Sequence, residues 1–430
     1  MSTAPPPAPR CAIIGIHPDD GASLTAAARA RLLTADCVIG SAQTLAQLGE
    51  LLPPQVERRP FDGQLAAVAD WIRAAHARHQ RVVVLTSGDP LCHGLGSQLT
   101  AALGVERVEI LPAVSSVQLA FARLGRAWQT VTIASCHHHD SGEWHWSATP
   151  HHALYSTLRS VARAELVAVL TSPANSPARL ARALLTAGYG DEVRLSIASR
   201  LTSPDEQVVA DLPLAAAAEC EFATPNVVIV DRQPPPNPLP LTGIADDFFT
   251  TNSAQRGLIT KAEIRAVALS KLALRADSVM WDVGAGSGAV GLEASRLCQF
   301  GDVWAIEQHP ERAAQIVATA RALRATNYHL TVGQAPRDLT NWPAADAVFV
   351  GGNSGQLVAI VQQSLARLRT GGRLVMSVVL LDALAQLTNW LDAQGVNWEL
   401  VQLTVARSQA LGSHQRLAAL NPVWLVTVVN

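Results

Sequence analysis

A glycine-rich stretch between an apolar run and a helical pattern holds the residues best suited to chemistry in this 430-residue chain. The segment WDVGAGSGAVGLEASRL, residues 281–297, places three glycines at alternate positions. Glycine lets a ligand approach the backbone, because no Cβ blocks the way and positive φ angles are accessible. The helix that follows offers unpaired N–H groups in its first turn. We therefore predict a nucleotide site, whose contacting residues are Gly284, Ala285, Gly286, Ser287 and Gly288.

The glycines alone leave the nucleotide open. Gly284, Gly286 and Ala289 also satisfy the G-x-G-x-x-G/A dinucleotide fingerprint, and a glycine turn can be purely structural. Asp282 occupies an acidic position that is common in methyltransferases binding S-adenosylmethionine. Glu307, at the end of the next predicted strand, is placed to accept hydrogen bonds from ribose hydroxyls of either cofactor. A helix before the glycine strand and an antiparallel strand near residue 425 favour a methyltransferase over an NAD(P)-dependent oxidoreductase.

Alternating strands and helices are predicted to position this site. Apolar residues at three-to-four spacing predict helices, and short apolar runs that end in turn residues predict buried parallel strands. A helix at 260–274 precedes the glycine strand, and the apolar tail 415–429 is predicted to close the sheet as an antiparallel edge. The predicted strands lie at 10–16, 81–90, 166–173, 192–201, 225–232, 279–283, 303–306, 347–350 and 373–379.

A proline-rich stretch, DRQPPPNPLPLTG at residues 231–243, marks the clearest boundary. Its prolines disfavour helix and central strand and favour a stiff, extended connector. A chain of this length is expected to hold more than one domain. We predict an α/β protein with two domains, residues 1–235 and 241–430.

The composition excludes several function classes. Apolar residues make up 49% and charged residues 16% of the chain, and the formal net charge is −2. Such a balance argues against the basic face that nucleic acids require, and no run of eighteen apolar residues suggests a membrane span. Six scattered cysteines without a C-x-x-C pair predict reduced thiols in a cytoplasmic protein. We expect no nucleic acid or membrane partner, and a homo-oligomer.

The second part of the chain resembles the C-terminal domain of the precorrin-6Y C5,15-methyltransferases (decarboxylating), a family of the vitamin B12 pathway. Matching sequence segments, among them VWAIEQHPERAAQI and AVFVGGNSG, follow one another in the same order through residues 243–430. The resemblance implies cofactor contacts by Thr260, the glycine turn, Glu307 and Ala335. Gln334 departs from the family, because it replaces the Asp of a GDAP word, and its polar contact to the adenine edge is expected to differ.

The first part resembles the tetrapyrrole methylases, a two-lobed methyltransferase fold. The words VVVLTSGDPLCHGLGSQL and VEILPAVSSVQLAFARLG carry the likeness. In this family an S/T-G-D-P turn and a P-x-x-S-S turn border the cofactor cleft, although an Asp before a proline can also be a simple turn former. The first loop departs, with His17 and Asp19 where many members carry glycine. The implied cleft residues are Ser87, Gly88, Asp89, Pro90, Ser115 and Ser116.

Together the resemblances imply a two-lobed tetrapyrrole methylase fold followed by a Rossmann-like class I methyltransferase fold. One S-adenosylmethionine per domain is expected, with methylation of the tetrapyrrole at C5 by the first domain. Methylation at C15 and decarboxylation of the ring C acetate are expected of the second. Whether the substrate carries cobalt stays open, whereas the intact glycine turn argues against a catalytically silent tetrapyrrole-binding scaffold. Arginine suits a polycarboxylate substrate, and the candidate substrate-binding residues are Arg256, Lys261, Arg265, Arg407 and Arg416.

A histidine-rich segment at residues 137–152 invites a metal-site interpretation. Adjacent histidines point in different directions, and no carboxylate set completes a site. We therefore predict no metal and a solvated, mobile loop. The alternative is that Trp144 and Trp146 make the segment a flap over the flat macrocycle.

Overall fold

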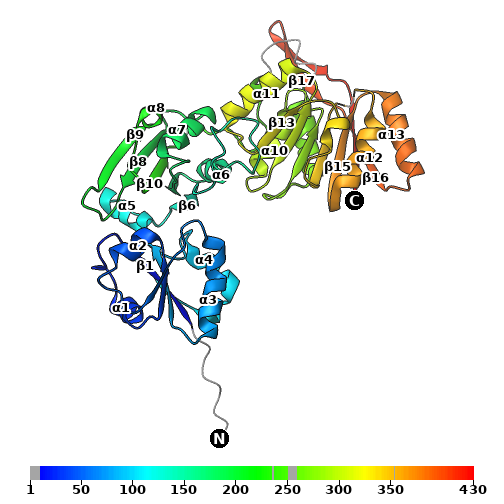
Figure 1. Cartoon of the computed structure of the whole chain (residues 1–430). Helices are drawn as coiled ribbons and strands as arrows, with labels where there is room; N and C mark the ends of the chain where they lie inside the picture. The colour runs from blue at the N-terminus through cyan, green and yellow to red at the C-terminus, as the bar shows by residue number, and fades with distance from the viewer. Residues whose placement is uncertain (1–9, 235–236, 250–258, 353) are drawn as a thin grey trace. The chain divides into compact units, whose positions relative to one another are not determined.

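The computed structural model describes residues 10–234, 237–249, 259–352 and 354–430 (Figure 1). These residues form two compact units. The first comprises the described residues up to His138 together with Leu166–Ala178 and Arg194–Asp231, and the second comprises His139–Glu165, Arg179–Val193 and the described residues from Arg232 on. Two short segments of the first half thus pack with the second half. The predicted domain division at residues 235 to 241 stays a prediction.

A parallel five-stranded sheet opens the first unit. Its order is β3-β2-β4-β1-β5, and the neighbouring strands run parallel. Successive side chains of β1 face opposite layers, so that Ile14 packs with Leu32 and Ile13 packs with Ile72. Helices therefore cover both faces, as parallel sheets require. The elements are β1 (Cys11–Ile16), α1 (Ala26–Leu33), β2 (Cys37–Gly40), α2 (Ala42–Gln47), β3 (Glu57–Pro60), α3 (Val68–Ala77), β4 (Val82–Ser87), α4 (Leu95–Leu103), β5 (Val108–Leu111) and α5 (Ser116–Leu124).

A second sheet has the order β6-β7-β10-β8-β9. Three of its strands were predicted, but the expectation of an all-parallel arrangement is wrong. β7 pairs antiparallel with β10, and β8 pairs antiparallel with β9. The direction of a strand depends on pairings across the chain, which local hydrophobic patterns do not record. The elements are β6 (Thr132–Ser135), α6 (Tyr155–Arg163), β7 (Leu166–Leu170), α7 (Pro177–Thr186), β8 (Val193–Ser199), β9 (Gln207–Pro213), α8 (Leu214–Glu219) and β10 (Asn226–Arg232).

The second unit is built on a seven-stranded sheet of order β13-β12-β11-β14-β15-β19-β16, with a separate β17–β18 hairpin. Five strands run parallel from β13 to β15. The elements are α9 (Ala262–Leu272), β11 (Met280–Val283), α10 (Ala289–Leu297), β12 (Val303–Glu307), α11 (Pro310–Leu323), β13 (Tyr328–Val332), β14 (Ala345–Val350), α12 (Leu357–Arg367), β15 (Leu368–Val378), α13 (Leu381–Ala393), β16 (Trp398–Leu403), β17 (Ala406–Leu411), β18 (His414–Ala419) and β19 (Val423–Val429).

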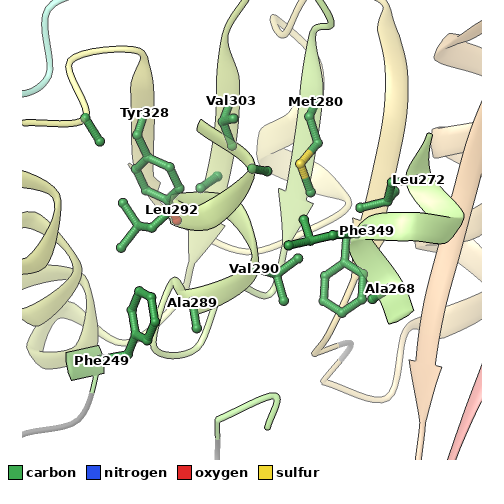
Figure 2. Close-up of a cluster of buried hydrophobic side chains, with 14 of the residues drawn as sticks. Phe249, Ala268, Leu272, Met280, Ala289, Val290, Leu292, Val303, Tyr328 and Phe349 are labelled. Carbon is green, nitrogen blue, oxygen red and sulfur yellow. The ribbon is translucent and has the colours of Figure 1, made fainter. Parts of the chain in front are cut away.

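The core of this unit has two apolar layers, one on each face of the sheet. Met280 of β11 packs in the same cluster as Leu292 of α10, as Figure 2 shows. The next residue, Trp281, belongs to the opposite cluster together with Ile360 of α12. The alternation fixes the face that each strand presents to each helix layer. The packing of α10 against β11 also holds the start of this helix at the carboxyl ends of the parallel strands.

The apolar tail forms an antiparallel strand, as predicted, but it does not lie at the sheet edge. β19 pairs antiparallel with β15 on one side and with β16 on the other. Leu425, Val426 and Val428 are buried in the core. The predicted edge position is therefore wrong, because β16 takes the edge.

Candidate functional site

The glycine turn connects β11 to α10 at the carboxyl edge of the sheet. Gly284, Gly286 and Gly288 have φ angles of 70°, 61° and 74°. A Cβ on Gly284 would lie 2.3 Å from the carbonyl oxygen of Gly352, two residues beyond the end of neighbouring β14. Two strand ends thus meet backbone to backbone. The floor of the site is consequently free of side chains at this point.

Glu307 ends β12 and reaches back to the glycine turn. Its Oε2 accepts a hydrogen bond from the Gly286 N–H at 2.9 Å, and its Oε1 accepts one from the His309 N–H at 3.0 Å. Arg312 lies 3.8 Å from Oε1. Only 4% of the residue is exposed. A carboxylate fixed in this way keeps unused lone pairs for hydroxyl donors.

These residues line a cavity of about 220 Å³ at the carboxyl edge. Ligands of open α/β sheets bind at this edge. Eight predicted residues line it: Thr260, Gly284, Ala285, Gly286, Ser287, Glu307, Gln334 and Ala335. Several other lining residues were not predicted from the sequence, including Gln308, Arg312, Gly333, Phe349, Gly351, Gly352 and Ser354. The Gly351–Gly352 pair directly after an apolar strand was the signal that could have identified part of this set.

Asp282 and Gly288 support the turn without lining the cavity. Asp282 is 1% exposed, and its Oδ2 accepts hydrogen bonds from the Gly291 N–H at 3.0 Å and the Tyr328 hydroxyl at 3.5 Å. Burial raises the pKa of this carboxyl to about 7. A Cβ on Gly291 would lie 2.4 Å from that oxygen. Gly291 and Tyr328, both missed, let α10 and β13 close over the carboxyl.

The buried Asp282 carboxyl makes the stability of the second unit depend on pH. Its folded pKa of about 7 exceeds the usual value of about 3.9. Folding therefore takes up a proton between these values, and the free energy of unfolding falls as pH rises from about 4 to about 7. Asparagine cannot ionise, so Asp282→Asn should gain stability relative to the wild type by about 1–4 kcal/mol between pH 5 and pH 8. Urea unfolding across this range measures the difference.

The exposed Asp277 provides a matched control for this prediction. Asp277→Asn should follow the wild-type pH profile. Parallel profiles for the wild type and Asp282→Asn would show that the Asp282 carboxyl ionises normally.

Gln334 lies in the turn after β13. Its backbone N–H donates to Asp338 Oδ2 at 2.8 Å, and its carbonyl accepts from the Asp338 N–H at 3.1 Å. The hydrogen bonds from Arg337 and the Gln334 N–H hold the pKa of Asp338 at about 2. The turn is thus closed by Asp338, four residues further on. The contact between Gln334 and the cofactor stays a prediction.

The candidate substrate-binding cations occupy different environments. Arg265 is fully buried, with Nε 2.9 Å from Glu293 Oε1 and Nη1 3.1 Å from Asp246 Oδ1. Its guanidinium thus supports the fold in this structure rather than presenting a surface to substrate. Arg407 also pairs with Asp246, at 2.9 Å. Lys261 precedes α9, Arg416 donates to Gln409 within the β17–β18 hairpin, and Arg256 lies outside the described residues.

The two predicted turns of the first unit are neighbours. Gly88, with a φ of 62°, follows β4, and a Cβ on it would lie 3.6 Å from Ser116 N and 3.7 Å from Ser115 Cα. Ser115 caps α5, where its Oγ accepts from the Gln118 N–H at 3.1 Å. Asp89 Oδ1 accepts from the Leu91 N–H at 2.8 Å and so also shapes the turn before Pro90. Their role in a cofactor cleft stays a prediction.

The histidine-rich segment is an exposed loop with buried tryptophan. His137, His138, His139, His145 and His151 are exposed, whereas Trp144 is 4% exposed. The Trp146 indole N–H donates to the Thr186 carbonyl at 3.0 Å. Trp144 is buried and Trp146 packs, partly buried, against the core of the second unit, so the flap alternative has no support here. Among the described residues, no group of three or more His, Cys, Asp or Glu could hold a metal ion.

All six cysteines are free thiols, and four of them are buried. In the part of the chain that the structure covers, no helix is both long and apolar enough to cross a lipid bilayer.

The sheet order, with antiparallel β19 between β15 and β16, and the glycine-lined cavity define a Rossmann-like methyltransferase of class I. A family model described as "Precorrin methyltransferase domain" matches residues 251–430, and one described as "Tetrapyrrole (Corrin/Porphyrin) Methylases" matches residues 10–217. A Sinorhizobium protein named precorrin-6Y C(5,15)-methyltransferase (decarboxylating) is 31% identical over 409 residues, which cover 94% of this chain and 92% of that protein. The chain therefore belongs to the precorrin-6Y C5,15-methyltransferase (decarboxylating) family.

Two further relatives match the C-terminal part. A Salmonella typhi protein named cobalt-precorrin-6B C(15)-methyltransferase (decarboxylating) is 34% identical over 169 residues, which cover 39% of this chain and 87% of that protein. A crystal structure named precorrin-6Y C5,15-methyltransferase from Geobacter metallireducens is 38% identical, with a TM-score of 0.42, and the match covers 45% of this chain and 100% of that one.

Proposed function

We propose that this methyltransferase transfers methyl groups to C5 and C15 of precorrin-6Y and removes the carboxyl group of the ring C acetate. Residues 1–235 are assigned methylation at C5, and residues 241–430 are assigned methylation at C15 and the loss of carbon dioxide. The full-length similarity to a protein named for both methylations carries this proposal. The separate C15 methyltransferase from Salmonella matches the second part and supports this division.

We further propose that each part binds its own S-adenosylmethionine. In the second part the cavity suits it, because glycines leave room beside the backbone and Glu307 offers a fixed acceptor for ribose hydroxyls. The cofactor would supply an activated methyl group. In the first part, the paired turns at Gly88 and Ser115 are the proposed cradle.

The protein's main task in methyl transfer is alignment. The nucleophile is an electron-rich meso carbon of the macrocycle, so strong general acid–base groups are not needed. Residues that hold both reactants in line lower the barrier by removing freedom of motion. In the decarboxylation step, the conjugated macrocycle of the substrate can accept the electron pair left by carbon dioxide.

The cobalt-bearing form of the substrate is a second candidate, because the Salmonella relative is named for a cobalt-precorrin. We also propose that the protein acts in the cytoplasm as a homo-oligomer. Light scattering on the purified chain measures the oligomeric state.

Incubation of the full chain with reduced precorrin and methyl-labelled S-adenosylmethionine tests the proposed reaction. Mass spectrometry should show a product that has gained two labelled methyl groups and lost one carbon dioxide. A parallel incubation with the cobalt-bearing precorrin identifies the preferred substrate. A product with a single methyl group and an intact acetate would contradict the proposal.

A further inference from the structure

A second cavity lies at the opposite end of the parallel strands from the cofactor cavity. Its volume is about 250 Å³, and its walls come from α6, the last turn of α10, and the residues just before β13. All of these residues belong to the second unit. Four arginines and no acidic residue line it: Arg159, Arg163, Arg296 and Arg324.

Among the described residues, three of these arginines donate hydrogen bonds to backbone carbonyls alone. Arg159, which is 7% exposed, and Arg163 both donate to the Gln299 carbonyl. Arg296 donates through Nη2 to the Leu239 carbonyl at 2.8 Å, while its buried Nε has no hydrogen-bond partner. Within the described ranges, no carboxylate forms an ion pair with any of the three.

Carboxylates around the cavity already form ion pairs, one of them with the fourth lining arginine, Arg324. Glu192 pairs with Arg324, Glu293 with the buried Arg265, and Asp302 with His329 at 2.8 Å. Burial lowers the pKa of Arg159, Arg163 and Arg296. The negative charges of Asp302 and Glu293 offset this effect only in part, at Arg159 and Arg296 respectively. Of the three arginines, Arg159 is the buried one, at 7% exposed. Buried charges are costly unless an opposite charge and hydrogen bonds accompany them.

We propose that this cavity binds a small, multivalent oxyanion of the phosphate class, at a site separate from methyl transfer. Guanidinium groups present planar forks of N–H donors that match phosphate oxygens. Three cations call for more than one negative charge, which favours phosphate over a single carboxylate. A bound anion would join α6 to α10 within the second unit.

Calorimetric titration of the full chain with inorganic phosphate, against sodium chloride at matched ionic strength, tests this site. Phosphate should bind and chloride should not. Arg296→Gln should weaken phosphate binding roughly tenfold or more, because it removes a charge-assisted hydrogen bond. Arg163→Gln should act in the same direction and, being exposed, is the variant expected to fold without difficulty.

Arg321→Gln is the matched control. Arg321 lies on α11, donates to the Leu185 carbonyl at 3.3 Å and does not line the cavity, so phosphate affinity should stay unchanged. Unaltered binding in both Arg163→Gln and Arg296→Gln, or no binding beyond that of chloride, would overturn the proposal. Citrate binding more tightly than phosphate would overturn the assignment to the phosphate class.

Discussion

Gly284→Val should abolish S-adenosylmethionine binding by the second part of the chain while the first part keeps its cofactor. The new Cβ would lie 2.3 Å from the Gly352 oxygen and 2.7 Å from its carbonyl carbon. Both atoms belong to the backbone at a strand end, so relief requires the two strand ends to separate. That movement would displace Ala285 and Gly286 from the cavity wall. C15 methylation and carbon dioxide release should fall more than a hundredfold, or roughly 3 kcal/mol, while C5 methylation continues.

Gly412→Val is a control that distinguishes the steric collision expected in Gly284→Val from the backbone strain of a positive φ angle. Gly412 lies between β17 and β18 with a φ of 60°, and a Cβ there would meet nothing within 4 Å. This variant carries the cost of a positive φ without the collision, so it should bind cofactor normally. Calorimetry with S-adenosylmethionine measures the number of sites in each variant. Loss of both sites in Gly284→Val, or of neither, would contradict the assignment of the glycine turn.

Glu307→Ala and Asp89→Ala should impair different steps of one reaction. Removing the Glu307 carboxylate frees the Gly286 and His309 N–H groups and takes away the predicted ribose acceptor. Cofactor affinity should fall roughly ten- to a hundredfold, and C15 methylation and decarboxylation should fall with it. A high S-adenosylmethionine concentration should partly rescue this variant. Asp89→Ala should instead slow C5 methylation while carbon dioxide release persists, and product masses distinguish the two outcomes.

Two controls accompany these variants. Glu311→Ala removes an exposed carboxylate from the first turn of α11 and should leave both steps intact. Asp89→Asn retains an acceptor for the Leu91 N–H and therefore tests whether Asp89 only shapes its turn. A product that keeps its acetate after Asp89→Ala but loses it normally after Glu307→Ala would reverse the assignment of chemistry to the two parts.

Local patterns in the sequence identified the elements around the site. β11, β12, β14 and β15 were expected from short apolar runs, and α9 from its helical spacing. β13 was missed, because the segment YHLTV mixes polar and apolar residues, although Gly333 directly follows it. The β17–β18 hairpin was missed because its strands are largely exposed and carry no clear alternation.

Residues that depend on spatial neighbours were harder to predict. The glycine turn can be recognised from one continuous segment of the sequence. The place of Gly352 beside this turn depends instead on the pairing of β14 with β11. Arg265 was selected as a substrate ligand on the basis of its residue type and family-like surroundings. Its burial against Glu293, 28 residues further along the chain, depends on how α9 packs on α10, which no local pattern records.

The position of β19 has a consequence for synthesis on the ribosome. Among the described strands, β16 pairs with β19 alone, and β19 is made after it. Until residues 423–429 emerge, β16 has no strand partner, and one edge of β15 exposes unpaired N–H and C=O groups, which are prone to pair with other chains. The nascent chain therefore carries this open edge until β19 has been made, and chaperone binding during that interval would protect it.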